Sequence, residues 1–446
     1  MRKFATIATA GLALCGAAQA QSNDELKARL DEAMRTIQDL QARVKSLADQ
    51  NKAPAPAAAA SAGTWGAPAV APNAKAEDGA KDAGQARVEI YGQAMLDAIY
   101  DFKRMNPDWA ATLRPSQIPI TCPGSPGCGK DGNFLFSIRQ SSLGVRSFIP
   151  TSLGLLKTDL SFDLFGTGGG STQVHWLRAW GEIGMIGAGQ TESNFMDLDA
   201  FPNTIDYWGP PGMVFIRNPQ LRITPYHQKG VTLALSLEAP NSAIDTGKLT
   251  QVDPSLGDTV QPWNRLPDLV GSVRYDGDWG HVKAAAVLRE VGAQATADPA
   301  ARSVTKTGWG INLAGAVKLF GKDTLSFQVA NGDAIASYMN DGGIDLAPNA
   351  SLHAQTVKSL GWFAYLNHAW NDKLTSAVGF SQHTQDNAGG QFDDAFHQGS
   401  YASVNLLYTP ARNILTGAEY IWGENKSKDG TSAQDDRIQF STKFQF

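Results

Sequence analysis

From residue 88 to residue 446, apolar and polar side chains alternate with a period of two. In the last ten residues, RIQFSTKFQF, Ile438, Phe440, Phe444 and Phe446 share one parity, while charged and amide side chains fill the other. Successive side chains of a β-strand point to opposite faces, so each such strand has an apolar face and a hydrated face. A strand buried on both faces would be apolar throughout, which excludes a parallel sheet covered on both sides.

The connections between these segments separate a soluble sandwich, whose strands also alternate, from a membrane barrel. Tight turns and long, polar, Gly-rich loops follow one another strictly along the chain. The tight turns are 149–153, 184, 226–230, 276–279, 320–323, 371–373 and 409–413. The long loops are 103–132, 166–173, 193–212, 239–267, 291–306, 332–356, 384–399 and 423–434. Seven turns and eight loops join sixteen strands, and transmembrane barrels show this asymmetry of short periplasmic turns and long outer loops.

The expected fold is therefore all-β, a 16-stranded antiparallel transmembrane β-barrel preceded by a short coiled-coil helix. The weakest strand boundary is the split at Gly184, because one uninterrupted strand there would make the count odd. No run after the N-terminus approaches the ~18 apolar residues of a membrane-spanning helix. The chain of 446 residues has a net charge of −5, and this near-neutral balance argues against a nucleic-acid partner.

The N-terminal 86 residues differ in pattern from the rest. Residues 1–20 have a basic start, an apolar stretch and AQA before the expected cleavage point, which predicts a secretory signal peptide; a buried N-terminal helix is the alternative. Residues 22–52 carry apolar side chains at heptad spacing and predict a periplasmic coiled coil, with a single amphipathic helix as the alternative. Residues 53–86 are rich in Ala, Pro and Gly and predict a linker. The barrel is expected over 87–446.

Two cysteines remain after removal of the signal peptide, which contains Cys15. Cys122 and Cys128 lie in CPGSPGC, within the first long loop. Export implies an oxidising compartment, so we expect them to form a small disulfide ring. A zinc site would need more ligands at matched spacing, so no metal and no other cofactor is expected.

Several stretches resemble the DcaP-like family of bacterial outer-membrane porins. They are FSIRQSSLGVRS from Phe136, RAWGEIGMIGAGQTESNFMDLDAFPNTIDYWGPPG and IRNPQLRITPY. The signal, the coiled coil, the spacer and the barrel ending in an aromatic residue fit the same family, so the resemblance covers essentially the whole chain. It implies a sixteen-stranded barrel, a homotrimer, a third loop that narrows the pore, and passage of small, often anionic, solutes.

Five arginines fall on the hydrated parity of their strands and are the candidate pore-lining cations. They are Arg139, Arg178, Arg222, Arg274 and Arg289. Guanidinium groups bind carboxylates and phosphates through paired hydrogen bonds. The alternative is that each arginine pairs with an acid of the lumen and only supports the wall. Arg146 falls on the lipid parity, which predicts a bulge or the membrane edge nearby.

The segment 193–212 is the candidate inward loop. It is long and carries large apolar side chains, among them Phe195 and Phe201. Folding into the barrel would bury these rings and place Asp197, Asp199 and Asp206 opposite the basic wall, creating a field across a narrow gap. The alternative is an outer loop packed on a neighbouring subunit.

The expected function is an outer-membrane porin for passive diffusion of small hydrophilic, preferentially anionic solutes, since channel selectivity comes from pore width and charge. The expected partners are outer-membrane lipid, two further copies of the chain and the solutes. No signature of a Ser-His pair on the barrel wall indicates an enzyme. The alternatives are a general, weakly selective or cation-preferring porin, and an envelope tether that contacts the cell wall through its coiled coil and has an incidental pore.

Overall fold

The computed structural model describes residue 35 and residues 85–122, 130–166, 172–297 and 302–446. The predicted signal peptide, almost all of the predicted coiled coil and nearly all of the linker lie outside these residues. The chain divides into two compact units, Met1–Ala60 and Ser61–Phe446. Every strand belongs to the second unit.

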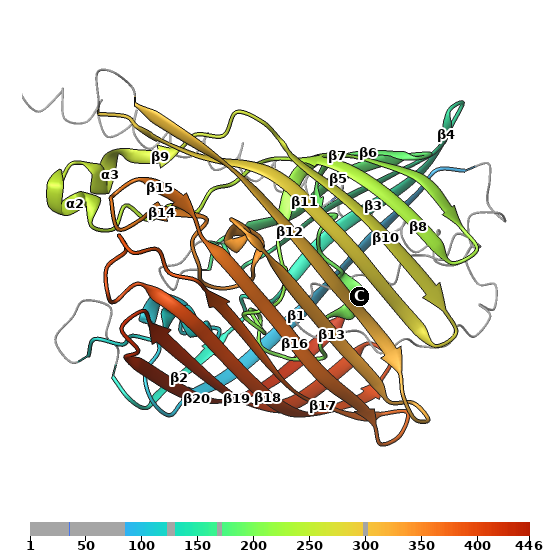
Figure 1. Cartoon of the computed structure of the whole chain (residues 1–446). Coiled ribbons are helices and arrows are strands. Elements are labelled where there is room, and N and C mark those ends of the chain that lie inside the picture. Colours follow the sequence, from blue (N-terminus) through green and yellow to red (C-terminus); the bar gives the residue numbers. More distant parts are fainter. Residues whose placement is uncertain (1–34, 36–84, 123–129, 167–171, 298–301) are drawn as a thin grey trace, which may run out of the picture. The chain divides into compact units, whose positions relative to one another are not determined.

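The second unit is a single continuous sheet that closes on itself (Figure 1). Each strand pairs antiparallel with its neighbours, and β1 pairs with β20 through residues such as Ala98 and Phe440. The strands of this sheet are β1 (Arg87–Asp101), β2 (Asn133–Ser137), β3 (Ser142–Thr151), β4 (Gly154–Asp163), β5 (His175–Ile183), β6 (Ile186–Glu192), β7 (Arg217–Gln228), β8 (Val231–Glu238), β9 (Val260–Pro262), β10 (Asp268–Gly277), β11 (Gly280–Ala295), β12 (Ser303–Lys318), β13 (Thr324–Asp333), β16 (Lys358–Ala369), β17 (Leu374–Gln385), β18 (Phe396–Ala411), β19 (Ile414–Ser427) and β20 (Ser432–Gln445).

Two of these strands are short extensions. β2 continues the line of β3 alongside β1, and β9 continues the line of β10 alongside β11. The wall is therefore a closed antiparallel barrel of sixteen strands, as the connection pattern predicts. The split at Gly184 is confirmed, because β5 and β6 form a hairpin with Ile183 opposite Ile186. Gly184 has a φ of 58°, in the left-handed region that suits a glycine at such a turn.

The remaining elements lie in the long loops. The helices are α2 (Leu249–Val252) and α3 (Leu256–Thr259), the 3₁₀ turns are η2 (Pro107–Trp109), η3 (Pro115–Gln117), η4 (Leu198–Ala200) and η5 (Ala336–Tyr338), and β14 (Leu346–Pro348) pairs with β15 (Ala354–Thr356). Among the described residues, no helix combines the length and the apolar character that a membrane crossing needs.

Two outer loops are shorter than predicted. β19 and β20 pair as far as Lys426 and Ser432, and β11 and β12 as far as Gln294 and Ser303. The predicted loops 423–434 and 291–306 therefore reduce to 428–431 and 296–302. Backbone pairing continues in both hairpins beyond the point where the regular alternation of apolar and polar side chains ends, and Val291 and Ala293 of β11 are buried there against Val304 and Val260.

The polarity of the barrel is inverted relative to a soluble protein. Phe440 and Phe446 are 52% and 62% exposed on the outside, while Arg437, Gln439 and Ser441 of the same strand have no exposed surface. Large exposed apolar side chains recur on nearly every strand of the wall. An apolar band outside a polar interior is the arrangement of an outer-membrane barrel.

Bulges interrupt the pairing at several points of the wall, and two of them change which residues of β3–β5 face inward. Asp97 pairs with Ser137 and Gln93 with Ser142, so the line of β2 and β3 has one more residue than β1 between these pairs. This extra residue reverses the parity and turns Arg146 inward, which confirms the bulge predicted from its position. A second shift, at β4 and β5, pairs Phe162 with Trp176 on the outer face.

Candidate functional site

The inward loop, residues 193–216 between β6 and β7, lies inside the barrel. Phe195, Met196 and Phe201 are buried. Asn312 of β12 donates from Nδ2 to the carbonyl of Phe195 at 2.8 Å, and Lys283 of β11 donates from Nζ to the carbonyl of Met196 at 2.7 Å. The prediction that this segment turns inward is confirmed, and the alternative of an outer loop on a neighbouring subunit is wrong.

The inward loop reaches the wall on several sides. Its start contacts β11 and β12, whereas the carbonyl of Ile205 accepts hydrogen bonds from Gln140, beside β3, and Gln439 of β20. Farther on, the amide of Gly212 donates to Ser381 Oγ of β17 at 3.0 Å. A Cβ at Gly212 would lie 2.2 Å from the carbonyl oxygen of Gln382, so only glycine allows this close approach. In the ring of sixteen strands, β11 is eight positions from β1, and the loop therefore crosses the lumen.

An apolar cluster fills the sector of the lumen beside β13 and β16–β19. It combines side chains of the inward loop with the loop that contains η5 and with the inner faces of the strands. Its members include Phe195, Met196, Phe201, Met213, Val214, Ile335, Tyr338, Met339, Phe363, Tyr365, Tyr401 and Ile421. By contrast, the inward side chains Trp180, Glu182, Arg222 and Arg274 keep part of their surface exposed. We call the inner face of β3–β11, where such partly exposed side chains lie, the accessible sector, although Val270, Ala285 and Val287 of β10 and β11 also belong to the apolar cluster.

Cationic side chains line this accessible sector, and we call six of them the basic wall. They are Arg146, Arg178, Arg217, Arg222, Arg274 and Lys283. Glu192 holds two of them: Arg178 Nε lies 2.9 Å from Glu192 Oε2, and Arg217 Nε lies 3.0 Å from Glu192 Oε1. Arg146 lies 4.0 Å from Asp159 and 4.6 Å from the centre of the Tyr91 ring.

Arg274 connects the inward loop to the wall. Its Nη1 lies 3.2 Å from Asp197 Oδ1 and 2.6 Å from Asp199 Oδ2, and its Nη2 lies 2.7 Å from Asp276 Oδ1. Asp197 also lies 2.8 Å from His281 Nε2. Burial by itself would raise the pKa of Asp197, but the hydrogen bond with His281 and the charges of Lys283 and Arg274 lower it below its ordinary value. Asp197 is therefore held as an anion.

The sequence predicts an electric field across an open gap between the acids of the inward loop and the basic wall. This prediction is wrong for Asp197 and Asp199, because both carboxylates pair directly with Arg274. Asp206 is not opposite the basic wall. It is fully buried, and its carboxylate accepts from Thr112 Oγ1 at 2.8 Å and from the amide of Leu113 at 3.1 Å. Parity arguments assign faces to strands, and they do not determine where a loop residue lies.

Arg222 and Lys283 are the cations of the basic wall that lack an acidic partner: within the described ranges, neither has a carboxylate within 4 Å. Arg222 donates from Nε to Gln220 Oε1 at 3.0 Å and from Nη2 to the carbonyl of Glu192, and it lies 5.5 Å from the ring of Trp180. The contact of Lys283 is the carbonyl of Met196. Neither side chain therefore forms a salt bridge with a described carboxylate, although Asp197 is close enough to Lys283, and Glu238 and Glu192 close enough to Arg222, for their charges to interact.

Arg139 and Arg289 lie on the inner side, as predicted, but are enclosed. The side chain of Arg289 has no exposed surface; it lies 3.2 Å from Asp268 and 3.7 Å from Asp345. Arg139 donates from Nη2 to the carbonyl of Gly166 at 3.0 Å and lies 4.1 Å from the Phe165 ring centre. Loops cover both guanidinium groups, so in this conformation neither has a surface with which to contact a solute.

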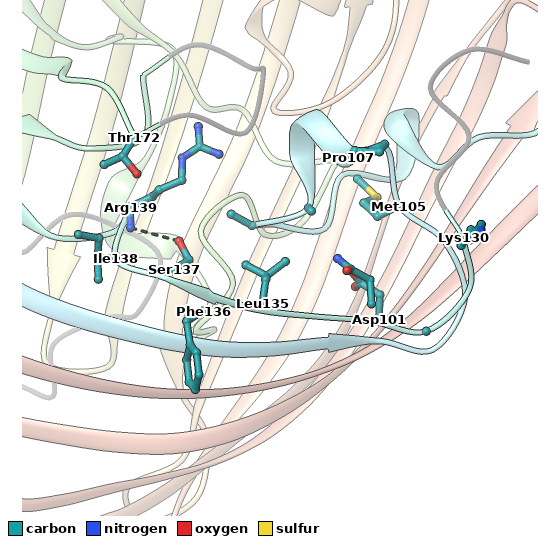
Figure 2. A pocket seen from close by; sticks show the side chains of 14 residues that line it. Asp101, Met105, Pro107, Lys130, Leu135, Phe136, Ser137, Ile138, Arg139 and Thr172 are labelled. Atoms are coloured by element: carbon teal, nitrogen blue, oxygen red, sulfur yellow. Dashed lines mark hydrogen bonds between the residues drawn. The ribbon is translucent and has the colours of Figure 1, made fainter.

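Figure 2 shows Arg139 at a cavity of about 530 Å³ between β2 and the first long loop, where its amide donates to Ser137 Oγ at 3.2 Å. The cavity is lined also by Met105, Leu135 and Phe136. Phe136 is exposed on the outer face of the barrel, and the cavity includes none of the basic wall. It is therefore separate from the accessible sector.

Cys122 is disulfide-bonded, and the predicted partner Cys128 lies outside the described residues. Within the described part of the chain, no three His, Cys, Asp or Glu side chains come close enough to hold a metal ion.

Lys283 and Glu192 are the functional candidates that the sequence reasoning did not single out. Lys283 lies on the hydrated parity of its strand, and that signal was available. Glu192 is the last residue of β6, and its pairing with Arg178 and Arg217 depends on the start of the inward loop. No local sequence pattern indicates this pairing.

The model of the family "DcaP outer membrane protein" matches residues 18–446. Among solved structures, the outer membrane channel DcaP of Acinetobacter baumannii has a TM-score of 0.68 at 20% identity and covers 81% of this chain and 97% of its own. An anion-selective porin from Comamonas acidovorans has a TM-score of 0.54 at 10% identity and covers 81% of this chain and 100% of its own. At these low identities, the TM-scores show that the three proteins share a fold. No curated protein sequence matches the chain. Because the family model spans nearly its whole length, this chain belongs to the DcaP family of outer membrane proteins.

Proposed function

We propose that this channel favours small hydrophilic anions, carboxylates among them, which diffuse passively through it. Family and fold make it an outer-membrane porin; the preference rests on one observation, the positive charges of Arg222 and Lys283, which form no salt bridge with a described carboxylate and lie beside the accessible sector. The nearby acids Glu192 and Asp197 already pair with other cations. Glu192 pairs with Arg178 and Arg217, and Asp197 pairs with Arg274 and His281. An excess of fixed positive charge raises the local concentration of anions.

A weakly selective or cation-preferring pore is the second candidate. Asp199 and Asp276 keep 46% and 45% of their side chains exposed beside Arg274, which is 22% exposed. A solute passing Arg274 therefore meets two accessible carboxylates. The balance between these acids and the Arg222–Lys283 pair decides the sign of the selectivity.

The reversal potential of the channel in a salt gradient across a planar bilayer tests this proposal. We expect the wild type to favour the anion, and we expect Arg222→Gln and Lys283→Gln each to shift the reversal potential toward cation preference. Lys318→Gln is the matched control, because Lys318 is exposed at the end of β12 and donates to the carbonyl of Asp278. A cation-selective wild type would leave the porin assignment intact and disprove the anion preference.

The protein is further proposed to form homotrimers, as the family resemblance implies, and to carry its N-terminal segment in the periplasm. A coiled coil over 22–52 would reach the cell wall from there. Deletion of residues 23–86 separates the two roles: a porin would still conduct, whereas a tether would lose its effect on the envelope. No catalytic step is part of the proposal.

A further inference from the structure

We propose that Asp97, Asp206 and Glu419 are positioning residues of the inward loop, which fasten its turn 203–206 to the wall in a proton-dependent way: the turn is docked at neutral and acid pH and released as pH rises. The effect of this docking on permeation rests on the proposed channel function, whereas the docking itself is measured independently of conduction.

The turn binds the wall through both backbone groups of one residue. The amide of Ile205 donates to Glu419 Oε2 at 3.0 Å, and its carbonyl accepts from Gln140 Nε2 and Gln439 Nε2, each at 3.0 Å. Asn405 Nδ2 donates to Glu419 Oε2 at 2.7 Å and to the carbonyl of Asn203 at 2.6 Å. Glu419 thus organises one side of the docked turn.

Asp97 organises the other side. Gln140 Nε2 donates to Asp97 Oδ2 at 3.1 Å, Gln439 Nε2 donates to Asp97 Oδ1 at 3.3 Å, and Ser441 Oγ donates to the same oxygen at 2.6 Å. The two amides that hold the carbonyl of Ile205 are therefore the amides that Asp97 orients.

Asp206 fastens the turn to the first long loop. Besides Thr112 and Leu113, its carboxylate accepts from the amide of Gly209 at 3.1 Å, and it lies 3.4 Å from the hydroxyl of Tyr401 on β18. The three carboxyl groups thus meet at one junction of β1, β19, β20 and two loops.

The junction has too few cations for three ionised carboxylates. All three groups are at most 1% exposed, and in the described segments none has a Lys, Arg or His nitrogen within 4 Å. Arg437 of β20 faces Asp206, but it is paired with Asp101 and also faces Asp435. The other titratable groups facing the junction are Tyr365 and Tyr401. Lys443 is buried on the same face of β20, two residues beyond Ser441 and opposite Met95 of β1.

Burying an anion without a cationic partner is unfavourable, so the docked turn favours protonated carboxyls. Glu419 Oε1 has no hydrogen-bond donor, which a neutral carboxyl tolerates better than a carboxylate. Burial raises the pKa of Asp206, although Arg437 and the hydrogen bonds to Asp206 oppose the shift. A group whose pKa is raised by folding stabilises the docked state at low pH and loses that contribution as pH rises through the raised value.

Amide hydrogen exchange of residues 203–209, measured by mass spectrometry on the full-length protein in detergent, tests the docking directly. Between about pH 6 and about pH 9, we expect wild-type exchange to accelerate by ~tenfold or more beyond the intrinsic base-catalysed increase, the equivalent of one pKa unit of coupling. Glu419→Gln keeps the shape and the acceptor for Ile205 but cannot ionise, so it should reduce this excess, and Asp97→Asn combined with Glu419→Gln should abolish it.

Glu424→Gln is the matched control, because Glu424 lies on the same strand but accepts from Gln434 away from the junction; it should keep the wild-type pH dependence. A wild-type protein without excess acceleration overturns the proposal and needs no variant to fold. A double variant that keeps the full excess also overturns it. Neither result depends on the reversal potential, so failure of the anion preference and failure of the docking are distinguishable.

Discussion

Glu192 controls how much of the positive charge of the basic wall a solute meets. It neutralises Arg178 through two hydrogen bonds and Arg217 through a third, and its side chain is 14% exposed. The unpartnered cations Arg222 and Lys283 are therefore a small excess on a nearly balanced wall. Selectivity in such a site depends on single residues, since one substitution removes half of the excess charge.

Replacing Glu192 by glutamine should increase anion preference. The change releases two guanidinium groups toward the accessible sector, so the reversal potential in a salt gradient should move further toward the anion than in the wild type. Glu424→Gln is the control, because Glu424 is a partly exposed acid near the outer end of β19 that accepts from Gln434 and is not part of the basic wall. An unchanged or cation-ward potential in Glu192→Gln would show that this carboxylate does not set the charge seen by the solute.

The inward loop is the element whose position the sequence predicts only in part. Its length and aromatic content predict that it enters the barrel, and the hydrated parity of Arg178, Arg222 and Arg274 predicts that they face inward. The contacts of Asp197 and Asp199 with one arginine, and the burial of Asp206, depend on a backbone path of 193–216 that no periodicity encodes. The bulge at Leu177 is equally local and shifts parity without a sequence signal, whereas the bulge beside Arg139 is indicated only by the lipid parity of Arg146.

Because Asp197 is an anion, the stability of the first half of the inward loop should fall at acid pH. Its pKa is lowered in the folded protein, so its stabilising contribution is complete above the ordinary value of 3.8 and is lost as pH falls through the lower folded value. We expect amide exchange of residues 195–199, corrected for the intrinsic rate, to be the same at pH 7 and pH 5 and to accelerate below about pH 3.8. Asp197→Asn should remove this acid dependence and accelerate exchange at pH 7.

The control for this measurement is Asp199→Asn, because Asp199 is half exposed and shares Arg274 with two other acids. It should leave the acid dependence largely in place. Equal acid dependence in wild type and Asp197→Asn would mean that another group anchors this half of the loop.

At the scale of the whole molecule, the apolar exterior is the property that the sequence predicts most completely. Period-two alternation and the order of short and long connections together determine strand number, closure and which face meets lipid. The sequence does not determine how the loops fill the interior, because their polar and apolar residues follow no repeat. Arg139 and Arg289 show the difference: their inward parity is correct, but loops that pack over them remove them from the accessible sector.

A charge placed on the outer face near the centre of the membrane should destabilise the barrel. Leu313 is exposed on β12 five residues from its periplasmic end, about half of the ~9–11 residues that a strand uses to cross the bilayer. Leu313→Arg should lower the free energy of unfolding in liposomes by about 2–4 kcal/mol. Leu319→Arg, at the exposed turn beyond the same strand, should cost about 0–1 kcal/mol. Equal costs at the two positions would contradict the assigned orientation of the wall in the membrane.

The inward loop is anchored by chemically opposite contacts at its two ends. At Asp197 an ionised acid is held by cations, while at the turn 203–206 crowded carboxyl groups favour bound protons. An acidic surrounding weakens the first anchor and an alkaline one weakens the second. The inward loop therefore has a limited operating range, and a bacterium that moves between acidic and alkaline niches would change the permeability of its envelope without making any new protein.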